Sequence, residues 1–168
     1  MKGHRIVSLM TGVMAAVASV SGLAPLAAAS DEIYNFGTNQ CLQPVRGSTS
    51  QGAAIVQAPC DGGAAQQWTA VSVGNNIFHY VNSLSRLCLD ARGGAVNHTP
   101  VQQWTCNNIS NERWQPGDVP TDYIPPLISR VSGTDGYCLD IPGDQNTAGL
   151  AMQIYRCNGT GAQEWWTP

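Results

Sequence analysis

Three side chains that suit the binding of a polyhydroxylated ring lie two or four residues from two cysteines in the middle of the chain. Asp90 follows Cys88 by two residues. Gln102 and Trp104 precede Cys106 by four and two residues. Residues two apart on a strand share a face, so a Cys88–Cys106 bond would gather the carboxylate, the amide and the indole in one patch. A carboxylate accepts hydroxyl donors, an amide donates and accepts, and an aromatic face packs against C–H groups. The spacing therefore favours a sugar site, and the alternative is a core tryptophan beside a turn aspartate.

The frame that positions these residues occurs three times along the chain. Each unit opens with Cys-Leu, continues to a second cysteine 18 or 19 residues later, and reaches a tryptophan eight residues beyond it. The units are 33–68, 77–114 and 127–166, and repeats of this size must share one core. Among the fifteen pairings that six cysteines allow, the repeat symmetry selects Cys41–Cys60, Cys88–Cys106 and Cys138–Cys157. The expected core residues are Leu42, Leu89 and Leu139 with Trp68, Trp114 and Trp165.

Short strands and turns are the expected local structure throughout these units. No apolar spacing of helical period occurs, whereas short pieces such as "IFHYV", "LCLD" and "MQIYRC" lie between Gly, Asn, Asp and Pro clusters. Such a pattern is typical of an all-β fold. The fold prediction is three β repeats, each stapled by one disulfide, around a pseudo-threefold axis.

In these recurring motifs the chain resembles the ricin B-type lectins, a β-trefoil family with Cys-Leu-Asp, Gln-x-aromatic-x-Cys and Gln-x-Trp in each repeat. The resemblance covers residues 33–166 and implies a β-trefoil that binds galactose or related glycan units without catalysis. In the middle unit it implies a sugar site made of Asp90, Gln102, Trp104 and Asn111, with Glu112 in the place of the motif's Gln and still able to accept a hydrogen bond.

The other two units match the family's sugar-binding motif less completely. The third unit supplies Asp140, Gln153 and Tyr155, but Ala162 occupies the Asn position. This predicts a partial site that is weaker or differently selective. The first unit matches at none of the four positions, which hold Gln43, Val56, Ala58 and Ala65. We therefore expect the best site in the second unit and none in the first.

The first 29 residues predict export. Lys2 and Arg5 precede an apolar run from Ile6 to Leu26 that ends in Ala27-Ala28-Ala29, which is typical of a secretory signal cleaved near Ala29. A transmembrane anchor is the alternative, but small and polar residues interrupt the run. Residues 30–168 then form one domain of ordinary size. The expected location is extracellular, where an even number of cysteines indicates disulfides.

Charge and residue usage narrow the classes of partner. Residues 30–168 contain six arginines and no lysine against eleven acidic residues, a formal charge of −5. This balance argues against nucleic acid and against insertion into an anionic membrane, since both need a basic footprint. No Cys-x-x-Cys pair accompanies the isolated His79 and His98, so neither a metal nor a cofactor is expected. The predicted partner is a galactose-containing or related glycan.

Two other functional classes stay open from the sequence. A protein-binding trefoil, such as a protease inhibitor or a toxin delivery subunit, would not need Asp and Gln-x-aromatic in two repeats. A glycoside hydrolase would need two carboxylates flanking a bond, and Asp90 with Glu112 is the one pair that shares a patch. Relatives of this fold are often attached to glycosidases, so a co-secreted glycosidase is a further possible partner.

Overall fold

The computed structural model describes residues 30–117, 124–131, 133 and 136–168, and its described part consists of strands, turns and short 3-10 helices. The predicted signal segment 1–29 lies outside the described residues. The strands are β1 (Asp31–Glu32), β2 (Tyr34–Asn35), β3 (Gln40–Pro44), β4 (Ile55–Pro59), β5 (Gln67–Gly74), β6 (Ile77–Asn82), β7 (Cys88–Ala91), β8 (Thr99–Trp104), β9 (Trp114–Pro116), β10 (Leu127–Ser129), β11 (Tyr137–Asp140), β12 (Gln153–Arg156) and β13 (Trp165–Trp166). The 3-10 helices are η1 (Val45–Gly47), η2 (Ser110–Glu112), η3 (Pro142–Asp144) and η4 (Gly161–Gln163). Within these residues, none of the helices has the length and apolar character that a bilayer span requires.

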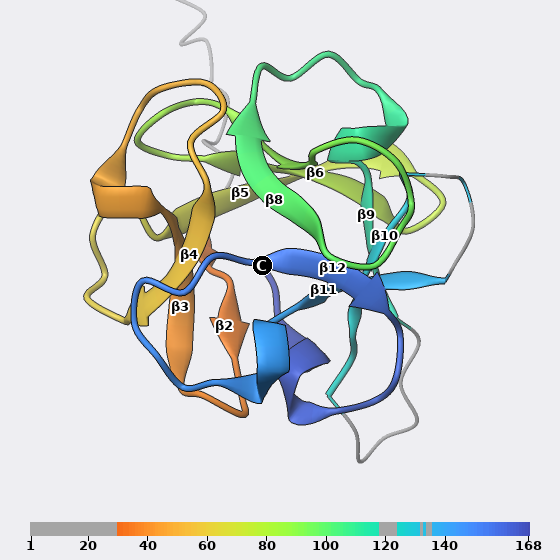
Figure 1. Cartoon of the computed structure of the whole chain (residues 1–168). Helices are drawn as coiled ribbons and strands as arrows, with labels where there is room; N and C mark the ends of the chain where they lie inside the picture. The colour runs from red at the N-terminus through yellow and green to blue at the C-terminus, as the bar shows by residue number, and fades with distance from the viewer. Residues whose placement is uncertain (1–29, 118–123, 132, 134–135) are drawn as a thin grey trace, which may run out of the picture.

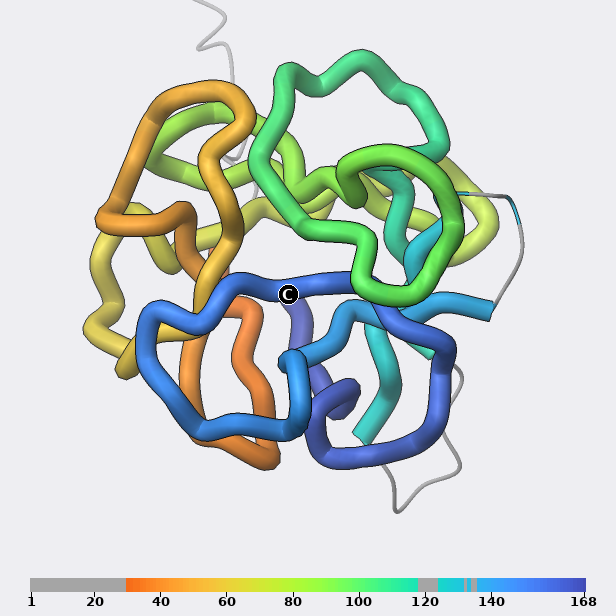
Figure 2. Tube along the Cα trace, viewed as in Figure 1, coloured from red at the N-terminus to blue at the C-terminus, as the bar shows by residue number. Residues whose placement is uncertain are grey.

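The three repeats form three lobes around a common axis, as expected for a β-trefoil. Figure 2 shows the lobes as the orange-yellow, green and blue parts of the trace. Their hairpins meet near the axis, where β8 pairs with β12, and single bridges join Ala54 to Gln102 and Val56 to Ala151. Strands of all three repeats therefore contact one another at the centre (Figure 1), and the all-β prediction is confirmed.

One antiparallel hairpin in each repeat carries the disulfide. These hairpins are β3–β4, β7–β8 and β11–β12. The disulfides Cys41–Cys60, Cys88–Cys106 and Cys138–Cys157 join α-carbons 5.1, 5.2 and 5.1 Å apart, so all three predicted pairings are confirmed. Each bond closes a loop of about twenty residues and contributes about 3 kcal/mol in the chain-entropy model.

The tryptophans of the repeats form the core together with the leucines of Cys-Leu. All six predicted core residues are at most 1% exposed. Each indole N–H donates to the carbonyl oxygen of the leucine in its own repeat, from Trp68 to Leu42 at 3.1 Å, from Trp114 to Leu89 at 2.9 Å and from Trp165 to Leu139 at 2.9 Å. A buried N–H without an acceptor costs about 1–3 kcal/mol. The repeated bond explains how a polar indole can fill an apolar core.

Candidate functional site

The hairpin register places the predicted side chains of the second repeat directly together. Asp90 lies opposite Gln102, and Cys88 lies opposite Trp104. The Gln102 amide donates from Nε2 to Asp90 Oδ1 at 2.8 Å. Asp90 and Gln102 are 3% and 8% exposed, whereas Trp104 is half-buried. Carboxylate, amide and ring therefore share one face of the hairpin, as the spacing predicts.

Asn111 closes one side of this second-repeat site from η2. Its Nδ2 donates to the carbonyl oxygens of Ala91 at 2.9 Å and Gly93 at 3.2 Å, both on the chain that leaves β7. With these bonds made, Asn111 Oδ1, Gln102 Oε1 and Asp90 Oδ2 have no protein partner in the described part of the chain. The site thus presents hydrogen-bond acceptors beside an aromatic ring, an arrangement that suits ligand hydroxyl groups.

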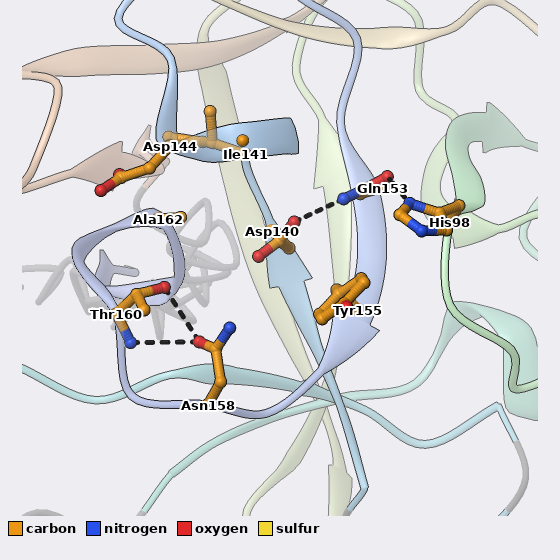
Figure 3. Close-up of a pocket in the computed structure, with 10 residues that line it drawn as sticks. His98, Asp140, Ile141, Asp144, Gln153, Tyr155, Asn158, Thr160 and Ala162 are labelled. Carbon is orange, nitrogen blue, oxygen red and sulfur yellow. Dashed lines mark hydrogen bonds between the residues drawn. The ribbon is translucent and has the colours of Figure 1, made fainter.

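The third repeat holds the corresponding residues around an open cavity of about 370 Å³. Asp140 lies opposite Gln153, which donates from Nε2 to Asp140 Oδ2 at 2.6 Å. Tyr155 lies opposite Cys138, at the register of Trp104 in the second repeat. Ala162, in the Asn position, is buried and lines the cavity without a polar group. Figure 3 shows Gln153 between Asp140 and a histidine that comes from the neighbouring repeat.

That histidine is His98, which was not among the predicted site residues. His98 Nδ1 lies 2.9 Å from Gln153 Oε1, and its ring meets that of Tyr155 edge-on at a centroid distance of 5.1 Å. Asp144, Asn158 and Thr160 also line the cavity and were likewise missed. Asp144 and Thr160 have no counterpart of the same type in the second unit, and the asparagine after the second cysteine recurs there as Asn107.

Both site aspartates are buried carboxylates whose ionised form burial disfavours. Burial is the main cause that raises the pKa of Asp90; the hydrogen bond from Gln102 acts against it and the charge of Glu112 adds to it. Burial also raises the pKa of Asp140; the hydrogen bonds from Gln153 and Gln163 and the electrostatic effect of His98 act against this rise, and the charge of Asp144 adds to it. A buried carboxylate with unused lone pairs is stabilised when further donors arrive. Ligand hydroxyls would supply such donors.

Glu112 does not belong to the sugar-facing surface, which corrects its predicted role. Its side chain is fully buried, and its carboxylate accepts the backbone N–H of Asn107 at 3.0 and 2.8 Å and of Asn108 at 2.9 Å. Gln66 and Gln163 take the same part in the other repeats, where they accept from Asp61 N at 2.8 Å and Asn158 N at 2.9 Å. Glu112 is therefore a structural brace behind the second disulfide.

The first repeat keeps this brace but has no site carboxylate. Gln66 donates from Nε2 to Gln43 Oε1 at 3.0 Å, in the place where Gln163 donates to Asp140 Oδ1 at 3.0 Å. Val56 lies opposite Gln43 and is buried. The hairpin frame is therefore compatible with neutral residues, and the charged pair is a feature of the second and third repeats.

Comparisons with known proteins bear on the family resemblance and on the fold. The family model described as "Ricin-type beta-trefoil lectin domain-like" matches residues 27–104, and the predicted resemblance to ricin B-type lectins is confirmed. No curated protein sequence matches the chain.

Solved structures share the fold over most of the chain. A designed threefold symmetric protein, ThreeFoil, is 26% identical, with a TM-score of 0.74 over 80% of this chain and 94% of its own. An exo-β-1,3-galactanase from Clostridium thermocellum is also 26% identical, with a TM-score of 0.75 over 82% of this chain but 29% of its own. The C-half of an earthworm R-type lectin, solved in complex with GalNAc, is 16% identical with a TM-score of 0.61, over 80% of this chain and 94% of its own. The ricin-type lectin fold and these neighbours support a carbohydrate-binding role.

Proposed function

We propose that this chain, whose β-trefoil is similar to the ricin-type lectins, is a secreted, non-catalytic protein that binds galactose-type units of glycans. The observation that carries the proposal is the buried Asp–Gln pair beside an aromatic ring in two repeats. Asp90 and Asp140 are 3% and 5% exposed and stand opposite their glutamines. The first repeat has neither the carboxylate nor the ring.

Such a site recognises a sugar through both of its chemical faces. Hydroxyl groups donate to the buried carboxylate, and the C–H face of the sugar packs on Trp104 or Tyr155. A few hydrogen bonds of about 0.5–1.5 kcal/mol each with one ring contact correspond to binding near the millimolar range. Two sites on one rigid body raise the avidity for a polymer or a glycan-bearing surface.

The second repeat carries the larger share of the binding in this proposal. It has all four side chains of the family's motif, and three of them each have an acceptor oxygen without a partner in the part of the chain that the structure describes. The third repeat lacks the Asn amide at Ala162, and its residues line a cavity of about 370 Å³. We therefore expect two sites of unequal strength, with none in the first repeat.

The galactose preference is supported by two structural neighbours, one of which acts on a galactan and the other of which binds GalNAc. One is named for its action on β-1,3-galactan, and the other was solved with GalNAc. Secretion is supported by the apolar segment that precedes residue 30 and by three disulfides, which persist in oxidising compartments. We keep a co-secreted glycosidase as a proposed partner of this chain, because the trefoil matches only 29% of a galactanase, the remainder of which lies outside the match.

Binding without catalysis is supported by the position of Glu112. Glycoside hydrolysis needs two carboxyl groups that flank the scissile bond, one to protonate the leaving group and one to act as base or nucleophile. Asp90 belongs to the candidate site with Gln102 and Trp104, but the Glu112 carboxylate is enclosed and held by two backbone N–H groups. The candidate acid–base pair therefore cannot face a substrate together.

Retention on galactose-agarose, with elution by free galactose, tests this function, and a printed glycan array identifies the preferred unit. We expect Asp90→Asn to weaken retention more than Asp140→Asn and the double variant to abolish it, because each change removes an ionised acceptor while preserving shape. Asp61→Asn, an exposed aspartate of the first repeat, is the matched control and should bind like the wild type. A wild-type protein that binds no glycan, or a double variant that binds normally, would refute the proposal.

A further inference from the structure

Three positions related by the pseudo-threefold axis make the same backbone hydrogen bond, but two of them are glycine and the third is histidine. The backbone N–H of Gly52 donates to Gln103 O at 2.8 Å, that of His98 to Ile154 O at 3.0 Å and that of Gly149 to Gln57 O at 2.8 Å. Each acceptor is the third residue before the second cysteine of the neighbouring repeat. The three residues therefore occupy the same place, where one repeat contacts the hairpin of the next.

All three residues adopt a backbone conformation that favours glycine. Their φ angles are +81° at Gly52, +67° at His98 and +85° at Gly149. A Cβ makes this left-handed region unfavourable, although histidine is among the side chains that enter it most often. Residues held in such conformations are concentrated at functional sites. His98 is the one of the three positions that carries a side chain, and the contacts of its ring indicate what that side chain does.

The His98 ring lies on the third-repeat site of the neighbouring unit (Figure 3). The Asp140 carboxylate can only accept, so the Gln153 amide must point its Nε2 donor at Asp140 and its Oε1 at His98. His98 Nδ1 then carries the hydrogen and donates to Gln153 Oε1 at 2.9 Å. His98 Nε2, which has no protein partner in the described residues, is left as an acceptor beside the cavity.

We propose that His98, supplied by the second repeat, is a positioning residue for carbohydrate bound at the third-repeat site. It fixes the Gln153 amide in the orientation that presents one Nε2 hydrogen to Asp140 and the other toward the cavity. It also holds the Tyr155 ring edge-on at 5.1 Å. This inference rests on the proposed function and explains how the third site keeps a defined shape although Ala162 replaces the Asn.

The second-repeat site lacks this device because the equivalent position is Gly52. A Cβ added to Gly52 would lie 3.5 Å from Trp104 Cζ3, which is an ordinary contact, so the space itself admits a side chain. Among the described residues, Gln102 Oε1 accordingly has no partner, whereas Gln153 Oε1 has one. The two sites thus differ in how firmly their glutamine is oriented.

The experiment uses an Asp90→Asn background, in which the third site alone remains, with methyl β-galactoside and a printed array of neutral galactosides as probes. His98→Gly is expected to weaken binding about three- to tenfold, the loss of one hydrogen bond. It should not lower the melting temperature, because glycine is favoured at this φ. His98→Asn, whose Nδ2 can replace Nδ1 at a backbone angle that asparagine tolerates, is expected to restore binding to within twofold.

Two matched measurements separate positioning from a general structural effect. In an Asp140→Asn background, His98→Gly should leave second-site binding unchanged. Nitrogen-15 NMR of the imidazole should show the Nδ1–H tautomer for His98. Unchanged third-site binding in His98→Gly, failure of His98→Asn to restore it, or an Nε2–H tautomer would overturn the inference while leaving the proposed function intact. If the wild type binds none of the probes, the proposed function fails and the inference fails with it.

Discussion

Replacing Glu112 with glutamine tests how the brace behind the second disulfide controls the neighbouring site. In the third repeat, Gln163 accepts from Asn158 N at 2.9 Å and donates to Asp140 Oδ1 at 3.0 Å. Glu112 can only accept, so it gives Asp90 no such bond and its charge adds to the rise in the pKa of Asp90. Glu112→Gln should restore the donor and remove the repulsion.

The magnitude follows from the bonds gained and lost. The new donor meets a charged acceptor, and such a bond contributes about 1.5–3 kcal/mol. The substitution loses the bond from Asn108 N at 2.9 Å, but Asn108 is exposed and water replaces the carboxylate, so this loss is about 0.5–1.5 kcal/mol. The net gain at neutral pH is about 1 kcal/mol, which corresponds to a rise in melting temperature of about 3 °C.

The pH dependence has a definite sign. Asp90 has a raised pKa in the folded state, so the folded protein loses stability as the pH rises from the ordinary value of 3.8 through that raised pKa. Glu112→Gln lowers the pKa of Asp90. The gain in stability of this variant over the wild type should therefore be full at neutral pH and absent below pH 3.8, where Asp90 is protonated in both proteins. The acid midpoint of sugar binding at the second site should also move to lower pH.

Thermal unfolding at several pH values and galactoside titrations in the Asp140→Asn background measure both effects. The reverse exchange, Gln163→Glu, is the matched control. It should lower stability at neutral pH and move the acid midpoint of the third site upward, measured in the Asp90→Asn background. A loss of stability in Glu112→Gln at neutral pH, or an upward shift of its midpoint, would refute the account of Glu112 as a brace that raises the pKa of Asp90.

Two further predictions concern the core. Trp114→Phe removes the 2.9 Å bond to Leu89 O and should lower the free energy of unfolding by about 1–3 kcal/mol, as measured by urea denaturation. An unchanged free energy of unfolding in this variant would contradict the role of the repeated indole bond. Burial raises the pKa of Tyr80 to about 12, so an alkaline absorbance titration should show a late tyrosine that is missing in Tyr80→Phe, and a titration identical in both proteins would count against that burial.

The fold and most of the site were predictable because they depend on residues that recur in phase. The Cys-Leu pair, the second cysteine and the tryptophan appear in every repeat, and each makes the same contact in each repeat. The hairpin register follows from them, since a disulfide near the end of a two-stranded ladder fixes which residues stand opposite one another. Asp90 opposite Gln102 is thus implied by the spacing of Cys88 and Cys106.

His98 and Glu112 were beyond the reach of that reasoning for two different physical reasons. The role of His98 comes from a neighbouring repeat and from a left-handed backbone position, and neither leaves a periodic signal in its own unit. Glu112 has the chemistry of a sugar ligand, so its type suggested a role that its burial prevents. The outcome depended on backbone N–H groups after Cys106, whose direction only the folded loop determines.

The first repeat shows what the charged pairs mean for stability. Its Gln43 and Gln66 close the same contact with neutral side chains, so the hairpin frame does not require a carboxylate. Burial raises the pKa of both Asp90 and Asp140, so each ionised group lowers the stability of the fold at neutral pH relative to its protonated form. A fold that keeps two such carboxylates, each beside an aromatic ring and a glutamine, retains them against its own stability. Donors from outside the protein would offset that penalty, and this is the physical reason to expect a hydroxyl-bearing ligand at the second and third repeats and none at the first.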